Sequence, residues 1–336
     1  MTLTPPAPHP AEIVHEGGPP GGRHVAVGSA VTLGTPGNEP STRRVTIPGR
    51  GTTTVLECAG PPGAPTVILL HGVSMNAELG WAQVMRPLAR HFRVVAPDQR
   101  GHAGGIPAGH RFSLEDCADD AVALAAALEV DRFIVVGYSM GGTVAQLIWR
   151  RHPQVVSGLV LCATGRNFVG SHVEQLLSMA MPAMMTWSAL TTGFTADVLR
   201  PTVLGTIGDS RTRGWTRAQM SRTSLGSALA AMQAVSEFTS HDWINEVDVP
   251  TVVVVTTQDR LVPAKRQRRL AAAINGAVVM ELHGDHGACV TAPEIFGRLL
   301  VIACRQVTTS TLGEQTSVDE RADDPQDEPA HTGDLT

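Results

Sequence analysis

Short apolar segments recur along the chain and predict the strands of a sheet. Six of them are rich in β-branched residues and apolar at consecutive positions, namely 66–70, 92–97, 132–137, 156–163, 250–257 and 277–283. Runs that are apolar on both faces are typical of parallel strands covered by helices on two sides. Two earlier segments, RRVTIP and TTTVLECAG, flank a turn at Gly49–Gly51 and predict two further strands.

Segments with a helical pattern separate these strands. One begins at Ser113, and Asp116 stands three residues later, an arrangement typical of a capping box ahead of an Ala- and Leu-rich run. Further helices are predicted at residues 77–90, 140–152, 263–275 and 293–304. Strands that alternate with helices predict an α/β protein with a doubly wound, mostly parallel sheet.

One long interval breaks this alternation and suggests an insertion. Residues 166–245 contain no strand-like run; they contain helical stretches with methionines at positions 179, 181, 184, 185, 220 and 232. The interval is too long for a simple crossover between two strands, so we expect a helical cap above the carboxyl edge of the sheet. The core then comprises residues 41–165 and 246–304. A disordered Pro- and Gly-rich leader is expected at 1–40, and an acidic disordered tail at 305–336.

Composition and charge narrow the range of partners. No apolar stretch approaches the length of a membrane span, and the N-terminus lacks the pattern of a signal peptide. The five cysteines are widely spaced without a C-x-x-C, which favours a reduced, cytoplasmic protein. The net charge of −5 falls mostly on the acidic tail. Because no basic face remains, we expect no nucleic-acid partner.

The segment VVGYSMGG, residues 135–142, contains the candidate nucleophile. A G-x-S-x-G match can arise by chance in a chain with 34 glycines, so its context has to decide. Here Ser139 follows a predicted buried strand and opens a predicted helix, the place expected of a nucleophile elbow. The backbone N–H of Met140 would then point from a helix N-terminus toward an oxyanion.

A serine nucleophile needs a base and an acid that orients the base. Two histidines, His283 and His286, follow the last predicted strand, and we favour His286 because His283 still belongs to the strand end. For the acid we favour Asp259, which follows the strand 250–257. Asp285 adjoins His286, and neighbouring side chains diverge; Asp248 precedes its strand and so lies at the wrong edge, and Asp242 is a further competitor.

Taken together, these motifs resemble those of the α/β-hydrolase fold superfamily, from about residue 43 to residue 304. The resemblance is carried by HGV (71–73), Asp98–His102, GYSMGG (137–142), QDRLVP (258–263) and GDHGACVTAPEIF (284–296). It implies a Ser139-His286-Asp259 site beneath a helical cap, with oxyanion donors at Val73 and Met140. In the family a proline follows the catalytic histidine by seven residues, and Pro293 has this spacing from His286. His71 and Asp98–His102 are expected to be scaffold.

The sequence therefore predicts a serine hydrolase that cleaves carboxylic esters of small to medium apolar substrates. No cofactor is expected, and no metal site, because the chain lacks an H-E-x-x-H or comparable cluster. The same residues would serve C–C bond hydrolysis, lactone opening, thioester cleavage or cofactor-free perhydrolysis, and a binding protein could keep the fold as a ligand receptor. Nothing in the sequence indicates an oligomeric state.

Overall fold

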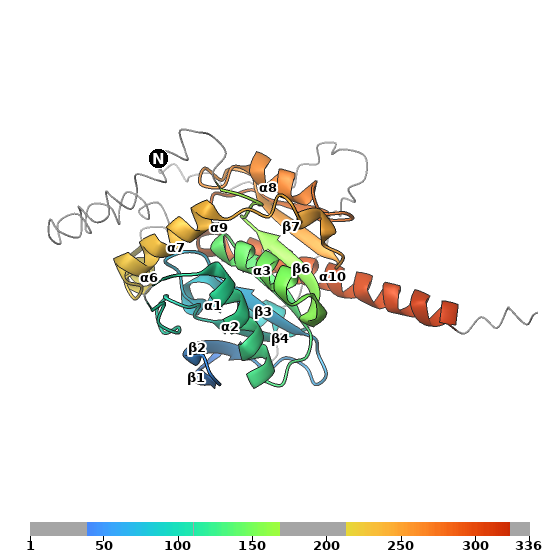
Figure 1. The fold of residues 1–336 in the computed structure, drawn as a ribbon, viewed down its shortest axis with the longest axis horizontal. Coiled ribbons are helices and arrows are strands. Elements are labelled where there is room, and N and C mark those ends of the chain that lie inside the picture. Colours follow the sequence, from blue (N-terminus) through green and yellow to red (C-terminus); the bar gives the residue numbers. More distant parts are fainter. Residues whose placement is uncertain (1–38, 110, 169–212, 323–336) are drawn as a thin grey trace, which may run out of the picture.

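The computed structural model describes residues 39–109, 111–168 and 213–322 of the 336-residue chain. In these residues a central sheet lies between two layers of helices (Figure 1). The predicted leader lies almost wholly outside the described residues, as does the end of the predicted tail.

The sheet has eight strands. They are β1 (Ser41–Ile47), β2 (Gly51–Cys58), β3 (Thr66–Leu70), β4 (Arg93–Pro97), β5 (Phe133–Tyr138), β6 (Val156–Cys162), β7 (Thr251–Thr256) and β8 (Val278–Leu282). Their spatial order is β1-β2-β4-β3-β5-β6-β7-β8. The pairs β1–β2 and β2–β4 are antiparallel, and the other neighbours are parallel. The doubly wound, mostly parallel sheet predicted from the sequence is confirmed.

Burial explains why the apolar runs form the middle of the sheet. Every residue of β3, β5 and β7 is buried, as expected for strands with helices on both faces. The edge strand β1 differs, because most of its residues are exposed. The uninterrupted apolar runs therefore mark the parallel centre, and the polar run marks the antiparallel edge.

The helices cover the two faces of the sheet. Those on the faces are α1 (Ala77–Leu88), α2 (Leu114–Ala127), α3 (Met140–Arg151), α8 (Ala264–Ala271), α9 (Ala288–Thr291) and α10 (Pro293–Ala322). The segment between β6 and β7 adds α6 (Arg213–Met220) and α7 (Leu225–Glu237). Side chains of α2, α3 and α8 form one apolar core with residues such as Leu70, and those of α1, α9 and α10 form the other with residues such as Leu69. Consecutive strand residues thus enter opposite cores.

The predicted start of the helix at Ser113 is confirmed. Its side-chain oxygen accepts a hydrogen bond from the backbone N–H of Asp116 at 3.1 Å. Asn76 caps α1 in the same way, accepting from the backbone N–H of Leu79 at 2.7 Å. Both caps satisfy N–H groups that the first turn of a helix leaves without a partner.

The boundary predicted at residue 304 between core and tail falls inside a helix, and the predicted disorder of the tail stays a prediction. Helix α10 begins at Pro293 and continues through Ala322 without an intervening proline. Val307 is 1% exposed, and a Cβ built on Gly158 of β6 would lie 2.9 Å from the Val307 Cβ. Packing against the sheet therefore carries the helix beyond the predicted boundary. Residues 323–336 lie outside the described part of the chain.

The insertion between β6 and β7 contains α6 and α7. The side-chain amide of Asn76 donates to Gln219 Oε1 of α6 at 2.9 Å, and the backbone N–H of Ala103 donates to Thr223 Oγ1 at 3.2 Å. Asn76 and Ala103 belong to loops that follow β3 and β4, so this part of the insertion packs on the carboxyl edge of the sheet. Most of the predicted cap methionines lie outside the described residues; Met220 is buried in the core.

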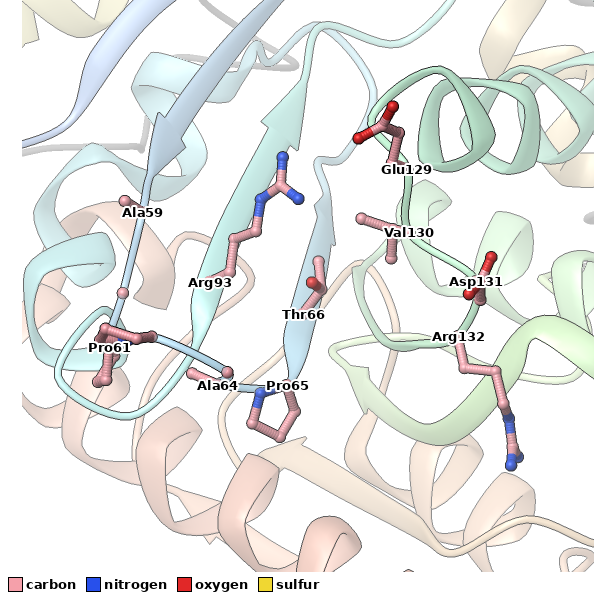
Figure 2. A pocket seen from close by; sticks show the side chains of 13 residues that line it. Ala59, Pro61, Ala64, Pro65, Thr66, Arg93, Glu129, Val130, Asp131 and Arg132 are labelled. Atoms are coloured by element: carbon pink, nitrogen blue, oxygen red, sulfur yellow. The ribbon is translucent and has the colours of Figure 1, made fainter.

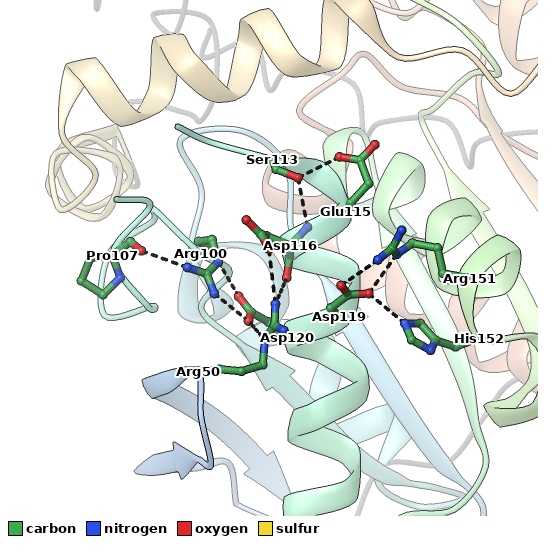
Figure 3. Close-up of polar contacts among 10 residues, drawn as sticks. All are labelled: Arg50, Arg100, Pro107, Ser113, Glu115, Asp116, Asp119, Asp120, Arg151 and His152. Atoms are coloured by element: carbon green, nitrogen blue, oxygen red, sulfur yellow. Dashed lines mark hydrogen bonds and ion pairs between the residues drawn. The ribbon is translucent and has the colours of Figure 1, made fainter. Parts of the chain in front are cut away.

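Two neighbouring carboxylates fix α2 to its surroundings (Figure 3). Asp120 accepts hydrogen bonds from Arg50, in the β1–β2 turn, and from Arg100, in the loop after β4. Asp119 accepts from Arg151 and His152 at the end of α3, and the hydrogen bond from Arg151 lowers the pKa of Asp119 to about 2. The Arg100–Asp120 pair thus ties the loop after β4 to α2, and the Asp119 pairs tie the end of α3 to α2.

Candidate active site

Ser139 lies on the sharp turn between β5 and α3. Its backbone has φ 53° and ψ −116°, a left-handed conformation that is rare for a residue with a Cβ. The conformation is held from both sides, because the Ser139 N–H donates to the carbonyl of Cys162 and its carbonyl accepts from Thr164 Oγ1, each at 2.9 Å. The turn therefore presents the serine side chain at the carboxyl edge of the sheet.

Glycines make this turn possible. A Cβ at Gly137 would lie 2.2 Å from the carbonyl oxygen of Gly141, and one at Gly141 would lie 2.0 Å from that of Leu70. Strand and helix approach too closely for any side chain at these two positions. The glycines of the motif thus have a steric role that a chance match would not require.

The structure brings Ser139, His286 and Asp259 together from three separate segments. The Nε2 atom of His286 lies 2.9 Å from Ser139 Oγ, and Nδ1 lies 2.7 Å from Asp259 Oδ2. Because a carboxylate only accepts, Nδ1 carries the hydrogen, and Nε2 is left to accept from the serine hydroxyl. Ser139 follows β5, Asp259 follows β7 and His286 follows β8, so the parallel strands deliver all three to one edge.

The carboxylate of Asp259 is buried and fully hydrogen-bonded. Its side chain has no exposed surface, and Oδ1 accepts from the backbone N–H groups of Leu261 and Val262 at 2.9 and 2.8 Å. A buried carboxylate needs such donors to remain charged. The loop after β7 therefore fixes this carboxyl group with its second oxygen directed at His286.

The competing residues lie elsewhere. His283 is exposed at the end of β8, and its Nε2 lies 3.0 Å from the side-chain nitrogen of Gln258. Asp285 accepts from the backbone N–H of Gly287, Asp248 accepts from the indole of Trp149, and Asp242 is exposed. The described hydrogen bonds therefore single out His286 and Asp259 among the candidates.

Val73 and Met140 flank Ser139 as the sequence predicted for oxyanion donors. Met140 is the first residue of α3, where backbone N–H groups have no partner within the helix. Val73 follows Gly72 in the loop after β3, and a Cβ built on Gly72 would lie 3.4 Å from the Cβ of Ser139. The two segments thus meet beside the serine, and the oxyanion role of their N–H groups stays a prediction.

His71 and the segment Asp98–His102 form the scaffold of this loop, as expected. The buried ring of His71 donates through Nδ1 to the carbonyl of Gly72 at 2.8 Å and accepts at Nε2 from the backbone N–H of Gln99 at 3.0 Å. The Gln99 amide donates to the carbonyl of His71 at 2.6 Å. These bonds require a neutral imidazole and fix the loop that contains Val73.

Two buried histidines should make the fold sensitive to acid. Burial lowers the pKa of His71 to about 4 and that of His102 to about 3. Both stay neutral in the folded protein, whereas in the unfolded chain they bind a proton below about pH 6.5. The unfolded state therefore gains protons as the pH falls from about 6.5 toward 4, and each histidine costs about 1.4 kcal/mol of stability per pH unit.

We expect His102→Asn to flatten this dependence. The amide can keep the hydrogen bond to the carbonyl of Arg100 but does not titrate. Between pH 7 and pH 5 the variant should lose about 2 kcal/mol less unfolding free energy than the wild type, measured by urea unfolding. His283→Asn, at an exposed histidine, is the control and should leave the difference unchanged. An equal loss in His102→Asn and wild type would contradict the role of burial.

Sequence reasoning assigned no role to three side chains that support the site. Tyr138, the only tyrosine in the chain, is buried and donates its hydroxyl to the carbonyl of His286 at 2.9 Å. Thr256 and Gln267 hydrogen-bond Asp259. Tyr138 occupies the variable position before Ser139, and Thr256 and Gln267 stand in ordinary strand and helix patterns. Only the three-dimensional arrangement therefore reveals what they contact.

A second feature of the sheet is a groove on the side away from Ser139. A groove of about 590 Å³ lies at the opposite edge of the sheet, between the β2–β3 loop and residues 129–132 (Figure 2). Its lining contains charged side chains such as Arg93 and Glu129 but no serine, cysteine or histidine. Among the described residues, no cluster of three His, Cys, Asp or Glu could hold a metal ion, and no helix is long and apolar enough to cross a membrane.

Comparison with known proteins identifies the family to which this fold belongs. The family model for the alpha/beta hydrolase fold matches residues 65–293. The chain belongs to the α/β-hydrolase family. It is 30% identical to RutD of Serratia proteamaculans, whose name assigns it to carbamate hydrolysis, over 71% of this chain and 91% of that protein.

Other proteins similar to this α/β-hydrolase have names that refer to different reactions. The chain is 26% identical to the pyrrolizixenacetamide deacetylase of Xenorhabdus hominickii, over 70% of this chain and 89% of that protein. Among solved structures, a hydrolase from Pseudomonas aeruginosa matches with a TM-score of 0.66 at 23% identity, over 81% of this chain and 98% of that one. This α/β-hydrolase is thus a hydrolase, and membership of the family does not identify its substrate.

Proposed function

We propose that this α/β-hydrolase cleaves carboxylic esters of small to medium apolar substrates through an acyl-enzyme on Ser139. The observation that carries the proposal is the continuous hydrogen-bonded chain from Ser139 Oγ through His286 to Asp259, at 2.9 and 2.7 Å. A serine hydroxyl becomes a good nucleophile only when a neighbouring base accepts its proton, and His286 Nε2 is within reach to do so.

The reaction follows from these positions. His286 accepts the proton of Ser139 as Oγ attacks the ester carbonyl carbon, and Asp259 stabilises the imidazolium that forms. The N–H groups of Val73 and Met140 bind the oxyanion of the tetrahedral intermediate. The intermediate collapses, the bond to the alcohol oxygen breaks, and His286 passes its proton to the leaving alkoxide. Water, deprotonated by His286, then attacks the acyl group, which releases the acid and restores the serine.

An apolar substrate is supported by the side chains next to the site. Val73 is partly buried among apolar residues, and Leu261, two positions after Asp259, is 62% exposed. The cap methionines, which suggested the same from the sequence, lie mostly outside the described residues.

A second candidate is cleavage of an N-acyl bond in a carbamate or an acetamide. It is favoured by the names of the relatives, one a carbamate hydrolase and one a deacetylase. The same residues would act, with His286 donating its proton to a leaving nitrogen. C–C bond hydrolysis, lactone opening, thioester cleavage and perhydrolysis would also use this site, and cap and pocket decide among them.

A matched substrate panel tests the proposal. Wild type and Ser139→Ala would be assayed on p-nitrophenyl acetate, butyrate and octanoate, on the butyryl p-nitroanilide, on a p-nitrophenyl carbamate, and on a lactone and a diketone. We expect Ser139-dependent ester cleavage with kcat/KM rising at least tenfold from acetate to the longer esters, as about 0.8 kcal/mol per buried methylene allows. Ser139-dependent cleavage of the anilide or carbamate, with ester rates equal to those of Ser139→Ala, would instead favour the second candidate.

A further inference from the structure

Two buried polar side chains contact the same carboxylate oxygen that His286 uses. The hydroxyl of Thr256, at the end of β7, donates to Asp259 Oδ2 at 2.9 Å. The side-chain nitrogen of Gln267, on α8, lies 3.2 Å from the same oxygen. Thr256 is 1% exposed and Gln267 is not exposed at all, so water does not compete for these bonds.

The surroundings fix the direction of every hydrogen bond in this group. Gln267 Oε1 accepts from the backbone N–H of Thr256 at 3.0 Å, and Nε2 donates to the carbonyl of Val262 at 2.7 Å, so the amide has one possible orientation. Nε2 also donates to Thr256 Oγ1 at 2.8 Å. Because that oxygen accepts from Gln267, its own hydrogen is available for Asp259. The bonds run from Gln267 through Thr256 to Asp259.

These donors act on the carboxylate oxygen of Asp259 that faces the imidazole of His286. Oδ2 of Asp259 already accepts the Nδ1–H of His286 at 2.7 Å, while Oδ1 is occupied by two backbone N–H groups. Each further donor to Oδ2 draws negative charge away from the side that faces the imidazole. A strongly negative Asp259 stabilises the imidazolium that forms in the reaction, and a partly neutralised one stabilises it less.

We propose that Thr256, held in place by Gln267, partly neutralises the negative charge that Asp259 presents to His286, and so sets the acid limit of the reaction. The inference rests on the proposed serine-hydrolase function. In the described residues both side chains act through Asp259 and neither contacts Ser139. They are positioning residues, and the pH dependence of Ser139 reactivity is the property they control.

Other titratable groups near the Asp259–His286 pair stay unchanged when Thr256 is substituted. They are Tyr138 from β5, Cys162 from β6, Arg260 beside Asp259, Arg266 from α8, His283 and Asp285 from the segment after β8, and Cys289 from α9. Burial raises the pKa of Tyr138 well above its usual range and that of Cys289 to about 12, so both stay neutral near pH 7. None of these side chains is substituted in the Thr256 variants, so a shift seen in those variants and absent from Thr251→Val is assigned to the loss of the Thr256 hydroxyl.

The experiment measures the rate of inactivation by a fluorophosphonate between about pH 5 and pH 9, which requires no knowledge of the substrate. Thr256→Val removes the hydroxyl at nearly constant volume, and Thr256→Ser retains it. Thr251→Val is the matched control, since Thr251 is a buried threonine of the same strand whose hydroxyl donates to the carbonyl of Val249, at the opposite end.

In Thr256→Val we expect the midpoint of the acid limb to move upward by about half a pH unit. The shift is modest because the freed Gln267 N–H has Asp259 Oδ2 as its alternative acceptor. Thr256→Ser and Thr251→Val should keep the wild-type midpoint. Thr256→Ala places no additional methyl group beside the carboxylate, and its midpoint should move in the same direction as that of Thr256→Val. Thermal unfolding will show that each variant is folded.

Midpoints of Thr256→Val and Thr256→Ala that coincide with the wild type would overturn the inference, as would an equal shift in Thr251→Val. Failure of the proposed function is distinguishable, because wild type and Ser139→Ala would then be inactivated at the same rate at every pH.

Discussion

Replacing Ser139 by alanine should lower kcat/KM for an ester by about 10⁴-fold or more. The substitution removes the oxygen that forms the acyl-enzyme and leaves only substrate binding and the oxyanion donors. Alanine keeps the Cβ and meets the same left-handed backbone at φ 53°, so the turn and the fold should be retained. Steady-state kinetics with p-nitrophenyl butyrate measures the effect, and thermal unfolding tests the fold.

The two histidines after β8 supply a matched pair of controls. His286→Asn should lower kcat/KM by a factor similar to Ser139→Ala, because nucleophile and base act as one unit. His283→Asn, three residues earlier, should change kcat/KM by less than about threefold, since surface substitutions away from a site have small effects. A residual activity above about a tenth of wild type in Ser139→Ala would contradict the acyl-enzyme.

Asp259→Asn should lower kcat by about 10³–10⁴-fold, because the new amide would favour the wrong tautomer of His286. The N–H groups of Leu261 and Val262 require an acceptor where Oδ1 now lies, so the amide oxygen has to occupy that position. The NH₂ group then faces His286 Nδ1, which would have to accept and place the hydrogen on Nε2. An imidazole with its hydrogen on Nε2 cannot take the proton of Ser139.

The matched control is Asp285→Asn. Asp285 adjoins His286 in sequence but its side chain accepts from the backbone N–H of Gly287. This variant should retain kcat within about threefold of the wild type. A large loss in Asp285→Asn together with a small loss in Asp259→Asn, on the same ester, would assign the orienting acid differently.

Much of this arrangement could be predicted because it depends on short-range patterns. Consecutive apolar residues mark β3, β5 and β7, which are buried at every position. The glycines around Ser139 reflect contacts such as the 2.0 Å that would separate a Gly141 Cβ from the Leu70 carbonyl. Parallel strands bring their carboxyl ends to one edge, so residues that follow them in sequence meet in space.

The parts that could not be predicted depend on long-range packing. The continuation of α10 past residue 304 was missed because the sequence there is mostly polar and does not reveal that Val307 is buried against β6. Tyr138, Thr256 and Gln267 look like ordinary strand and helix residues, and their hydrogen bonds to the His286 loop and to Asp259 arise only from tertiary structure. Substrate choice likewise depends on the insertion between β6 and β7, of which residues 169–212 lie outside the described part.

The central claim is that Ser139 is a nucleophile activated by His286, and covalent labelling tests it most directly. The wild type would be treated with a fluorophosphonate at about pH 7.5, one unit above the ordinary pKa of a histidine. The protein would then be digested and the modified peptide identified by mass spectrometry. The account predicts one adduct on Ser139 and none in Ser139→Ala. An unlabelled wild type, an adduct on another residue, or equal labelling of Ser139→Ala would contradict it.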